Sequence, residues 1–216
     1  MIIIKYLSII IDGFFRAFGK YIGSIYYKSR LGYCGKGVTI RKPAYYTNLS
    51  LIEMHDNTNL YKGFVFISAG GKLIMKTGAA AAQRLTVITG NHGRKVGFPF
   101  KDKNGDIQKS LNKEQDVIVE EDVWIGADVI LCSGVIIGRC ANIGAGSVVR
   151  HNVPPYAIVI GNPAKIIGFS LNPDEIIEHE KELYPEEERL PLELLEKNYD
   201  KYFLKRLKEI KEFSKI

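Results

Sequence analysis

Cross-linking and metal-binding patterns are missing from this sequence. Its 216 residues contain only three cysteines, Cys34, Cys132 and Cys140, and no two of them have C-x-x-C spacing. An odd and sparse set of cysteines indicates reduced thiols rather than a disulfide framework. No group of histidines and cysteines has the spacing of a zinc site. We therefore expect neither disulfides nor a metal cofactor.

A strong charge bias and a long apolar run are missing as well. The net charge is +6, 46% of the residues are hydrophobic and 25% are charged. This composition is typical of a globular protein, and the length suits one domain with an appendage. The mild basic excess suits an anionic small ligand or a membrane surface. This charge is too weak and too dispersed to indicate a nucleic-acid partner. Aromatic residues are also not interleaved with arginine, as they are in motifs that bind RNA or single-stranded DNA.

The N-terminal segment is apolar but interrupted. Lys5, Asp12 and Arg16 break its apolar runs, which argues against a membrane-spanning helix. Lys5 and Asp12 also disfavour a signal peptide. Polar residues recur at helical spacing up to Ser24, which predicts an amphipathic helix within residues 1–35. Such a helix would lie on a membrane through its basic residues, or would pack on its own domain or on a sister subunit.

The strongest pattern lies between residues 117 and 153, where two series of side chains recur at every sixth position. The first series is aliphatic and the second is small or β-branched: Val119, Ile125, Leu131, Ile137, Ile143 and Val149, and then Val123, Val129, Val135, Ala141, Ser147 and Val153. A period of six indicates a short strand and a turn, with two inward side chains per unit. Three such units close a triangular coil, and stacked coils bury a continuous aliphatic column. The sequence therefore predicts a parallel β-helix.

Glycine follows the aliphatic residue at three points of this repeat, Gly126, Gly138 and Gly144. We expect these glycines to allow tight corners with positive φ, which other residues adopt only with strain. No catalytic role is expected for them.

The six-residue frame also extends upstream and is interrupted once. It passes through Met75, Ala81 and Val87, and irregular earlier coils are expected over residues 38–68. From Val87 to Val119 the spacing is not a multiple of six. A basic loop of about residues 93–116 is therefore expected to leave the coil just after His92.

The C-terminal part changes character after residue 153. "PPYAIVIGNPAKIIG" ends the repeat with prolines and one last short strand, and residues 171–216 read as a helical appendage. Two helices are predicted there, divided at Pro185. The second has an apolar stripe made of Leu195, Tyr199, Phe203 and Leu207. A helix at this end would cover the open edge of the last coil.

The repeat resembles a known family. "DVWIGADVILCSGVIIGRCANIGAGSVV" followed by "VPPYAIVIGNPAKIIG" is similar to the C-terminal half of the hexapeptide-repeat acyltransferases. Within that superfamily the chain resembles sugar and capsular-polysaccharide O-acetyltransferases. Its "GNH…PF" loop and its appendage also resemble the xenobiotic acetyltransferase branch. The resemblance, over about residues 75–170, implies an all-β left-handed β-helix for residues 36–170, a homotrimer, and acetyl-CoA in a groove between subunits.

The resemblance also implies particular site residues. The family's catalytic histidine falls on His92, and Asn91 beside it is a candidate acceptor contact. The implied acetyl-CoA contacts are Trp124, Ala127, Ala145, Arg150, His151 and Lys165. The family often has a lysine where this chain has His151, so the second phosphate contact departs from the family pattern. Lys165, from "GNPAK", is expected near the phosphates or, alternatively, on a plain solvated surface.

Elementary chemistry points to the same histidine. Acetyl transfer to a hydroxyl needs a base that works near neutrality, and imidazole is suited to this. His92 lies where the rigid coil ends and the loop begins, although a turn histidine is the plain alternative. His55 and His179 are weaker candidates. Trp124 precedes an inward aliphatic residue, so its side chain should point outward, into a coenzyme groove or a subunit interface.

These observations predict a cytoplasmic, homotrimeric, acetyl-CoA-dependent O-acetyltransferase that acts on a sugar hydroxyl of a surface polysaccharide or its precursor. The enzymatic alternatives are a xenobiotic (antibiotic) O-acetyltransferase and an amino-sugar N-acetyltransferase. A zinc-dependent hydratase on the same fold would need about three converging histidines, and only His92 is suitably placed. A non-catalytic β-helix scaffold would bind no coenzyme. If the N-terminal helix meets lipid, the enzyme would work at the inner face of the membrane.

Overall fold

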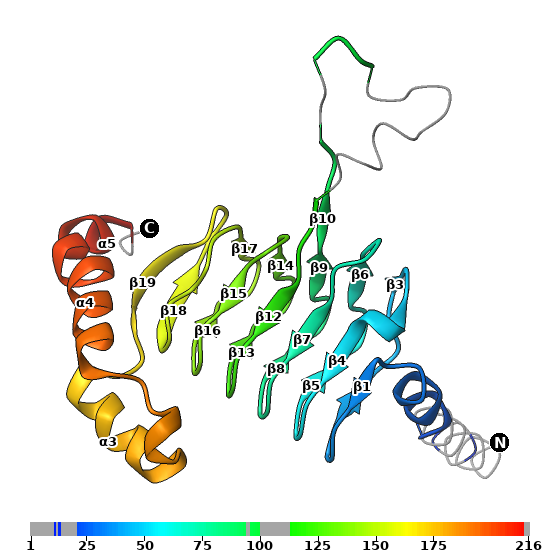
Figure 1. The fold of residues 1–216 in the computed structure, drawn as a ribbon, viewed down its shortest axis with the longest axis horizontal. Coiled ribbons are helices and arrows are strands. Elements are labelled where there is room, and N and C mark those ends of the chain that lie inside the picture. The colour runs from blue at the N-terminus through cyan, green and yellow to red at the C-terminus, as the bar shows by residue number, and fades with distance from the viewer. Residues whose placement is uncertain (1–10, 12, 14–20, 94–95, 100–112, 214–216) are drawn as a thin grey trace, which may run out of the picture.

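A computed structural model of the chain describes residues 11, 13, 21–93, 96–99 and 113–213. Figure 1 shows a row of stacked coils with a short helical segment at the N-terminal end and a group of helices at the other end. Residues 21–28 are helical, and the rest of the predicted N-terminal helix lies largely outside the described residues. Within the described part, no helix combines the length and the apolar character needed to span a bilayer.

Three sheets of mainly parallel strands form the walls of the stack. The first wall contains β1 (Tyr33–Cys34), β4 (Ile52–Met54), β7 (Leu73–Met75), β12 (Val117–Val119) and β15 (Ile136–Ile137). The second contains β2 (Thr39–Ile40), β5 (Asn59–Leu60), β8 (Ala80–Ala81), β13 (Trp124–Ile125), β16 (Asn142–Ile143), β18 (Ala157–Ile160) and β19 (Lys165–Phe169). The third contains β3 (Tyr45–Tyr46), β6 (Val65–Ile67), β9 (Thr86–Ile88), β14 (Ile130–Leu131) and β17 (Val148–Val149). Consecutive strands belong to consecutive walls, which confirms the predicted all-β left-handed parallel β-helix with terminal helices.

The inward side chains are those that the six-residue period predicts. All twelve residues of the two series are buried, and so are the upstream residues Met75, Ala81 and Val87. Met75, Val119 and Ile137 are paired in register across three coils, so the aliphatic column is continuous. Burial of this column is the main stabilising contribution to the stack.

The glycines of the repeat are needed for a different reason from the one expected. Gly126, Gly138 and Gly144 do not have positive φ, so the prediction of left-handed corners at these residues is wrong. A Cβ on Gly126 would lie 2.6 Å from the backbone nitrogen of Ala145, and one on Gly138 would lie 2.5 Å from that of Pro155. These positions require glycine because the next coil approaches too closely for any side chain.

Left-handed backbone occurs instead at another position of the same period. It is found one residue before five of the six small inward residues, at Asp122, Asp128, Gly134, Cys140 and Gly146, with φ between 53° and 77°. Asp adopts this conformation more readily than most side chains. Because some of these corners have a residue other than glycine, the glycine pattern of the sequence does not identify the turn position.

Among the described residues, extra residues enter the stack only at the corner between the third and first walls. The 3₁₀ helix η1 (Leu49–Leu51) lies there in the first coil, between β3 and β4. Ser68–Gly71 lies there in the second coil, and the long connection from β9 to β12 leaves from the same corner. The predicted extruded loop therefore lies at this corner, although residues 94–95 and 100–112 lie outside the described residues.

The end of the repeat differs from the expected single short strand. β18 and β19 form an antiparallel hairpin, and β19 is the outer strand of the second wall. The predicted second helix is divided at Phe203 into α4 (Leu192–Tyr202), the 3₁₀ turn η3 (Leu204–Arg206) and α5 (Leu207–Phe213). The ring of Tyr199 in α4 lies 5.5 Å from that of Phe169 in β19, so the appendage covers this edge as predicted.

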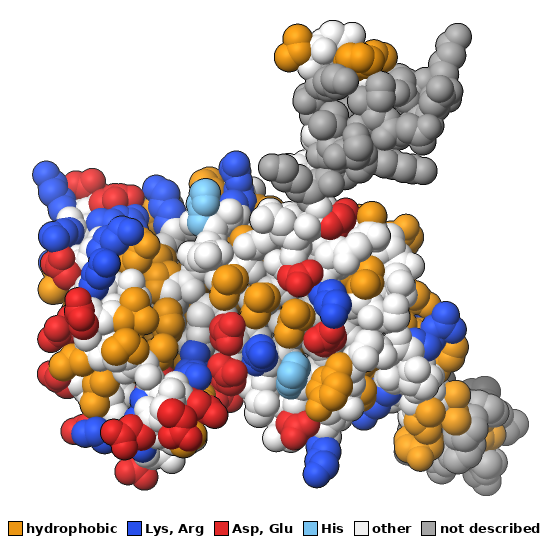
Figure 2. Space-filling model, in the orientation of Figure 1, with side chains coloured by type: hydrophobic (Ala, Val, Ile, Leu, Met, Phe, Trp, Pro, Cys, Tyr) orange, Lys and Arg blue, Asp and Glu red, His pale blue; other side chains and the backbone are white. Residues whose placement is uncertain are grey.

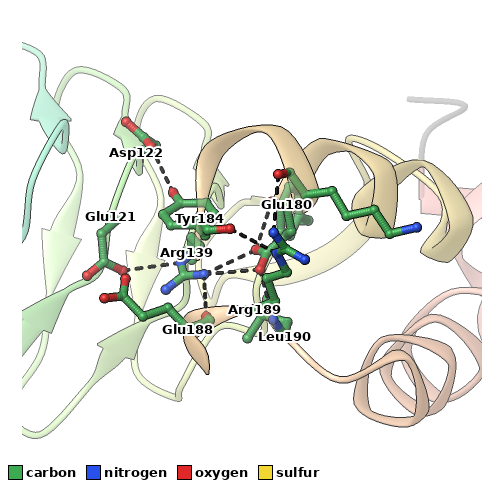
Figure 3. Close-up of polar contacts among 10 residues, drawn as sticks. Glu121, Asp122, Arg139, Glu180, Tyr184, Glu188, Arg189 and Leu190 are labelled. Carbon is green, nitrogen blue, oxygen red and sulfur yellow. Dashed lines mark hydrogen bonds and ion pairs between the residues drawn. The ribbon is translucent and has the colours of Figure 1, made fainter. Parts of the chain in front are cut away.

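A buried polar cluster attaches the appendage to the coils (Figure 3). Glu180, in α3 (Pro173–Leu183), has no exposed surface. Its carboxylate accepts hydrogen bonds from the Arg139 guanidinium at 3.1 Å, the Tyr156 hydroxyl at 3.0 Å and the Leu190 backbone N–H at 2.8 Å. Burial raises the pKa of the Tyr156 hydroxyl, so Tyr156 remains a donor. With so many partners, the buried carboxylate fixes α3 at the corner between the first and second walls.

Glu180→Gln is expected to lower the free energy of unfolding by about 3 kcal/mol, because Arg139 would lose its buried counter-charge. Urea denaturation measures the change. Arg84→Met is the matched control, since Arg84 pairs with Asp128 at the surface, where the two side chains are 61% and 52% exposed. The control is expected to unfold like the unaltered protein. Equal losses in the two variants would contradict a special role for the buried pair.

Candidate functional site

His92 lies at the exit of the loop. It directly follows β10 (Gly90–Asn91), which pairs antiparallel with β11 (Lys113–Glu114). This pairing holds the two ends of the loop together, and Figure 1 shows β10 continuing beyond the edge of the stack. The side chain of His92 is exposed, and its backbone N–H donates to the side-chain oxygen of Asn91 at 2.9 Å. The structure thus brings the two predicted residues Asn91 and His92 together at the seam between coil and loop.

The base of the loop is fixed by residues that the sequence did not reveal. Thr89 is fully buried, and its hydroxyl donates to the carboxylate of Glu114 at 2.7 Å. The Thr89 carbonyl accepts from the Gln115 backbone N–H at 2.9 Å and from the Ser133 hydroxyl. Gly71 adds a backbone N–H bond to Glu114 at 3.3 Å. Two separate segments therefore bond to Thr89, three positions before His92, and Gly71 holds its partner Glu114.

The first group of predicted coenzyme contacts lies on the second wall and the corner after it. Trp124, on β13, is 48% exposed, which confirms its outward direction. Ala127 and Ala145 occupy equivalent corner positions in successive coils, because Gly146 N–H donates to the Ala127 carbonyl at 2.8 Å. Ala145 is exposed and Ala127 is half-buried. This part of the surface has small side chains beside one exposed aromatic ring.

The second group lies together at the C-terminal end of the stack. Arg150, His151 and Lys165 line one hollow of about 330 Å³, so the structure brings these three predicted coenzyme contacts together. Arg150 and His151 follow β17, at the corner where His92 leaves after β9. The Lys165 ammonium lies 3.6 Å from the Glu209 carboxylate and 5.4 Å from the centre of the Phe213 ring. Lys165 therefore belongs to a basic hollow rather than to an isolated surface position.

The single chain does not bring the first group to His92. Trp124, Ala127 and Ala145 lie on one side of the third wall, whereas His92 leaves from its other side.

The remaining histidines have structural contacts. His55 stacks on Tyr33 with ring centres 4.9 Å apart, and His179 meets the edge of Tyr156 at 5.9 Å. Among the residues that the structure describes, no group of three or more His, Cys, Asp and Glu side chains could hold a metal ion.

The cysteines are all free. Burial raises the pKa of the Cys140 thiol to about 11 and also raises that of Cys34. Both therefore remain thiols at neutral pH, and neither is an activated nucleophile.

The comparisons with known proteins agree with this architecture. Residues 116–151 match the family described as "Bacterial transferase hexapeptide (six repeats)". A chloramphenicol acetyltransferase of Escherichia coli is 36% identical over 99 residues, which are 42% of this chain and 47% of that protein. A protein of Escherichia coli (strain K12) that is named as a lipopolysaccharide biosynthesis O-acetyl transferase, WbbJ, is 29% identical over 132 residues, 61% of this chain and 66% of that protein. The chain thus spans about half to two thirds of the length of these two relatives.

A solved structure supports the fold independently. The hexapeptide-repeat-containing acetyltransferase VCA0836 of Vibrio cholerae, determined with acetyl coenzyme A, superposes with a TM-score of 0.57. The alignment covers 68% of this chain and 75% of that one at 22% identity, so it bears on the fold alone. The six-residue period, the stacked coils, the family match over residues 116–151 and the acetyltransferase relatives agree in making this chain similar to the hexapeptide-repeat acetyltransferases.

Proposed function

We propose that this protein is an acetyl-CoA-dependent O-acetyltransferase in which His92 is the general base. One observation carries the proposal: an exposed histidine stands at the seam between a rigid corner and the base of a loop. Thr89 and Glu114 fix the backbone just before it, through a hydrogen bond of 2.7 Å. A base held in this way needs little reorganisation when the acceptor binds.

The reaction is a direct transfer between two bound substrates. The His92 imidazole removes the proton from the acceptor hydroxyl while the hydroxyl oxygen attacks the thioester carbonyl carbon. Backbone N–H groups stabilise the negative charge that develops on the carbonyl oxygen. The carbon–sulfur bond then breaks, and the leaving thiolate takes the proton back from the imidazolium. Because Cys34 and Cys140 remain thiols, the mechanism uses no acyl-cysteine at either residue.

The proposal includes a homotrimer whose sites lie between subunits. Trp124, Ala127 and Ala145 lie on the far side of the third wall from His92, so a neighbouring copy has to complete the site. Apolar side chains are available for such contacts, because Ile136 and Trp124 are 38% and 48% exposed on two different walls. Figure 2 shows hydrophobic side chains in a row across the middle of the stack, with charged side chains around them.

The proposed acceptor is a sugar hydroxyl of a surface polysaccharide or its precursor. The support is the relative whose name assigns it to lipopolysaccharide biosynthesis. An antibiotic hydroxyl is the second candidate, since a chloramphenicol acetyltransferase of Escherichia coli is 36% identical over the matched part. We place the reaction in the cytoplasm. Ile22 and Ile25 are 48% and 50% exposed in the helical segment before Lys28, which suits contact with the inner membrane face.

The first test is an acceptor screen that measures release of free thiol from acetyl-CoA. Saccharides of the capsule and lipopolysaccharide type are expected to accelerate release, and His92→Ala should reduce the rate by about 10²–10⁴-fold. His55→Ala serves as the control, because His55 stacks on Tyr33 away from the loop. Full activity in His92→Ala would reject the base. Acceleration by chloramphenicol but by no saccharide would reject the glycan acceptor.

A second test uses the single tryptophan, Trp124. Titration with CoA is expected to change its fluorescence emission in a saturable way, because the half-exposed ring would become covered by ligand. Calorimetry on the same samples gives an independent affinity. CoA binding without any change in emission would remove Trp124 from the coenzyme site.

A third test concerns the loop base. Thr89→Val keeps the shape of the side chain but removes the hydroxyl that bonds to Glu114, and it is expected to lower kcat by roughly five- to tenfold. KM for acetyl-CoA should change less, because Thr89 is not among the proposed coenzyme contacts. Thr86→Val is the matched control, since Thr86 lies on β9, three residues before Thr89, and is only half-buried. Equal activity in the two variants would contradict positioning by Thr89.

A further inference from the structure

The basic hollow at the C-terminal end of the stack is built from two parts of the chain. One side comes from the last coil and hairpin, with Arg150, His151 and Lys165, and the other comes from the appendage, with Tyr202 and Arg206. Its volume of about 330 Å³ lies at the small end of the range for ligand pockets. The appendage lies outside residues 116–151, which match the family.

Arg206 is held in place within this hollow. Its side chain is 27% exposed, and one guanidinium nitrogen donates to the Ile166 carbonyl of β19 at 3.5 Å. The turn η3, which contains Arg206, follows the break at Phe203, where φ is −121° and ψ is −67°. The break in the predicted helix therefore positions this guanidinium over the hairpin.

A carboxylate of the appendage already pairs with two of the cations. Glu209 accepts from the Arg206 guanidinium at 3.0 and 3.1 Å and lies 3.6 Å from the Lys165 ammonium. Its hydrogen bonds to Arg206 hold its pKa below the usual value, so it is charged at neutral pH. Because the Glu209 side chain is 52% exposed, this pairing contributes little stability and is easily exchanged for another anion.

We infer that the C-terminal appendage forms one wall of the phosphate end of the coenzyme site. Arg206 binds a phosphate group there, and Glu209 is an internal competitor that the phosphate displaces from Arg206 and Lys165. The planar guanidinium suits phosphate because it can donate two parallel hydrogen bonds. This inference rests on the proposed use of acetyl-CoA, and it adds a specificity-determining residue that the repeat does not contain.

Substitutions at Arg206 and Glu209 are expected to change the affinity for CoA in opposite directions. Calorimetric titration of the full chain with CoA measures this affinity. Arg206→Met removes the charge and should weaken binding about tenfold, whereas Arg206→Lys should restore part of the loss. Glu209→Gln removes the competitor and should tighten binding about threefold. Lys205→Met is the matched control: Lys205 pairs with Asp200, its side chain is 70% exposed, and it does not line the hollow. The control should stay within about twofold of the unaltered protein.

Salt dependence supplies a readout that a merely structural change would not reproduce. Arg206→Met should lose affinity less steeply with added salt than the unaltered protein, because one cation no longer contributes. The inference is overturned if Arg206→Met and Glu209→Gln both bind CoA like the unaltered protein, or if both shift in the same direction. If Arg206→Met fails to fold, Glu209→Gln still tests the inference, because its affinity for CoA should rise. An unaltered protein that binds no CoA would instead overturn the proposed function.

Discussion

Each coil of this protein has to return the backbone to hydrogen-bonding distance of the coil before it. Trp124 N–H reaches the Ala141 carbonyl at 3.0 Å, and Lys76 N–H reaches that of Val119 at 2.8 Å. A shift of one residue would break these bonds and turn the apolar side chains outward. The same condition leaves no room for a Cβ at Gly126, and in the described part of the chain extra residues enter at the corner between the third and first walls. The loop and its histidine are therefore located by the geometry of stacking.

The open end of the stack imposes a second condition. A last coil without a neighbour exposes unpaired backbone groups, so it has to be covered. In this chain the hairpin and helices cover it, and a buried cluster around Glu180 fixes their position. This cover also brings Arg206 and Glu209 beside Arg150 and Lys165. The element that closes the end of the core thus becomes part of the proposed coenzyme site.

The expectations that depend on the six-residue period are confirmed, and those that depend on backbone geometry or packing are wrong or incomplete. The inward series, the outward direction of Trp124 and the exit of the loop after His92 follow from the period, because every six-residue unit has the same two inward positions. The sequence pattern places the left-handed corners at the wrong residues, because Asp and Cys occupy some of them. Gly126 is required instead because the next coil leaves no room for a Cβ. The hairpin and the break at Phe203 were missed because both depend on packing at the end of the stack.

The sequence by itself determined the β-helix, its register and the position of its interruption, because a side-chain period is a local property that repeats along the chain. Only the tertiary structure decided which distant groups meet. Thr89 bonds to Glu114 across 25 residues, and Arg139 bonds to Glu180 across 41. No period relates these partners, since each contact depends on how a loop or the appendage packs against the finished coils. The sequence therefore supplies candidate site residues, and which of them lie together is a property of the fold.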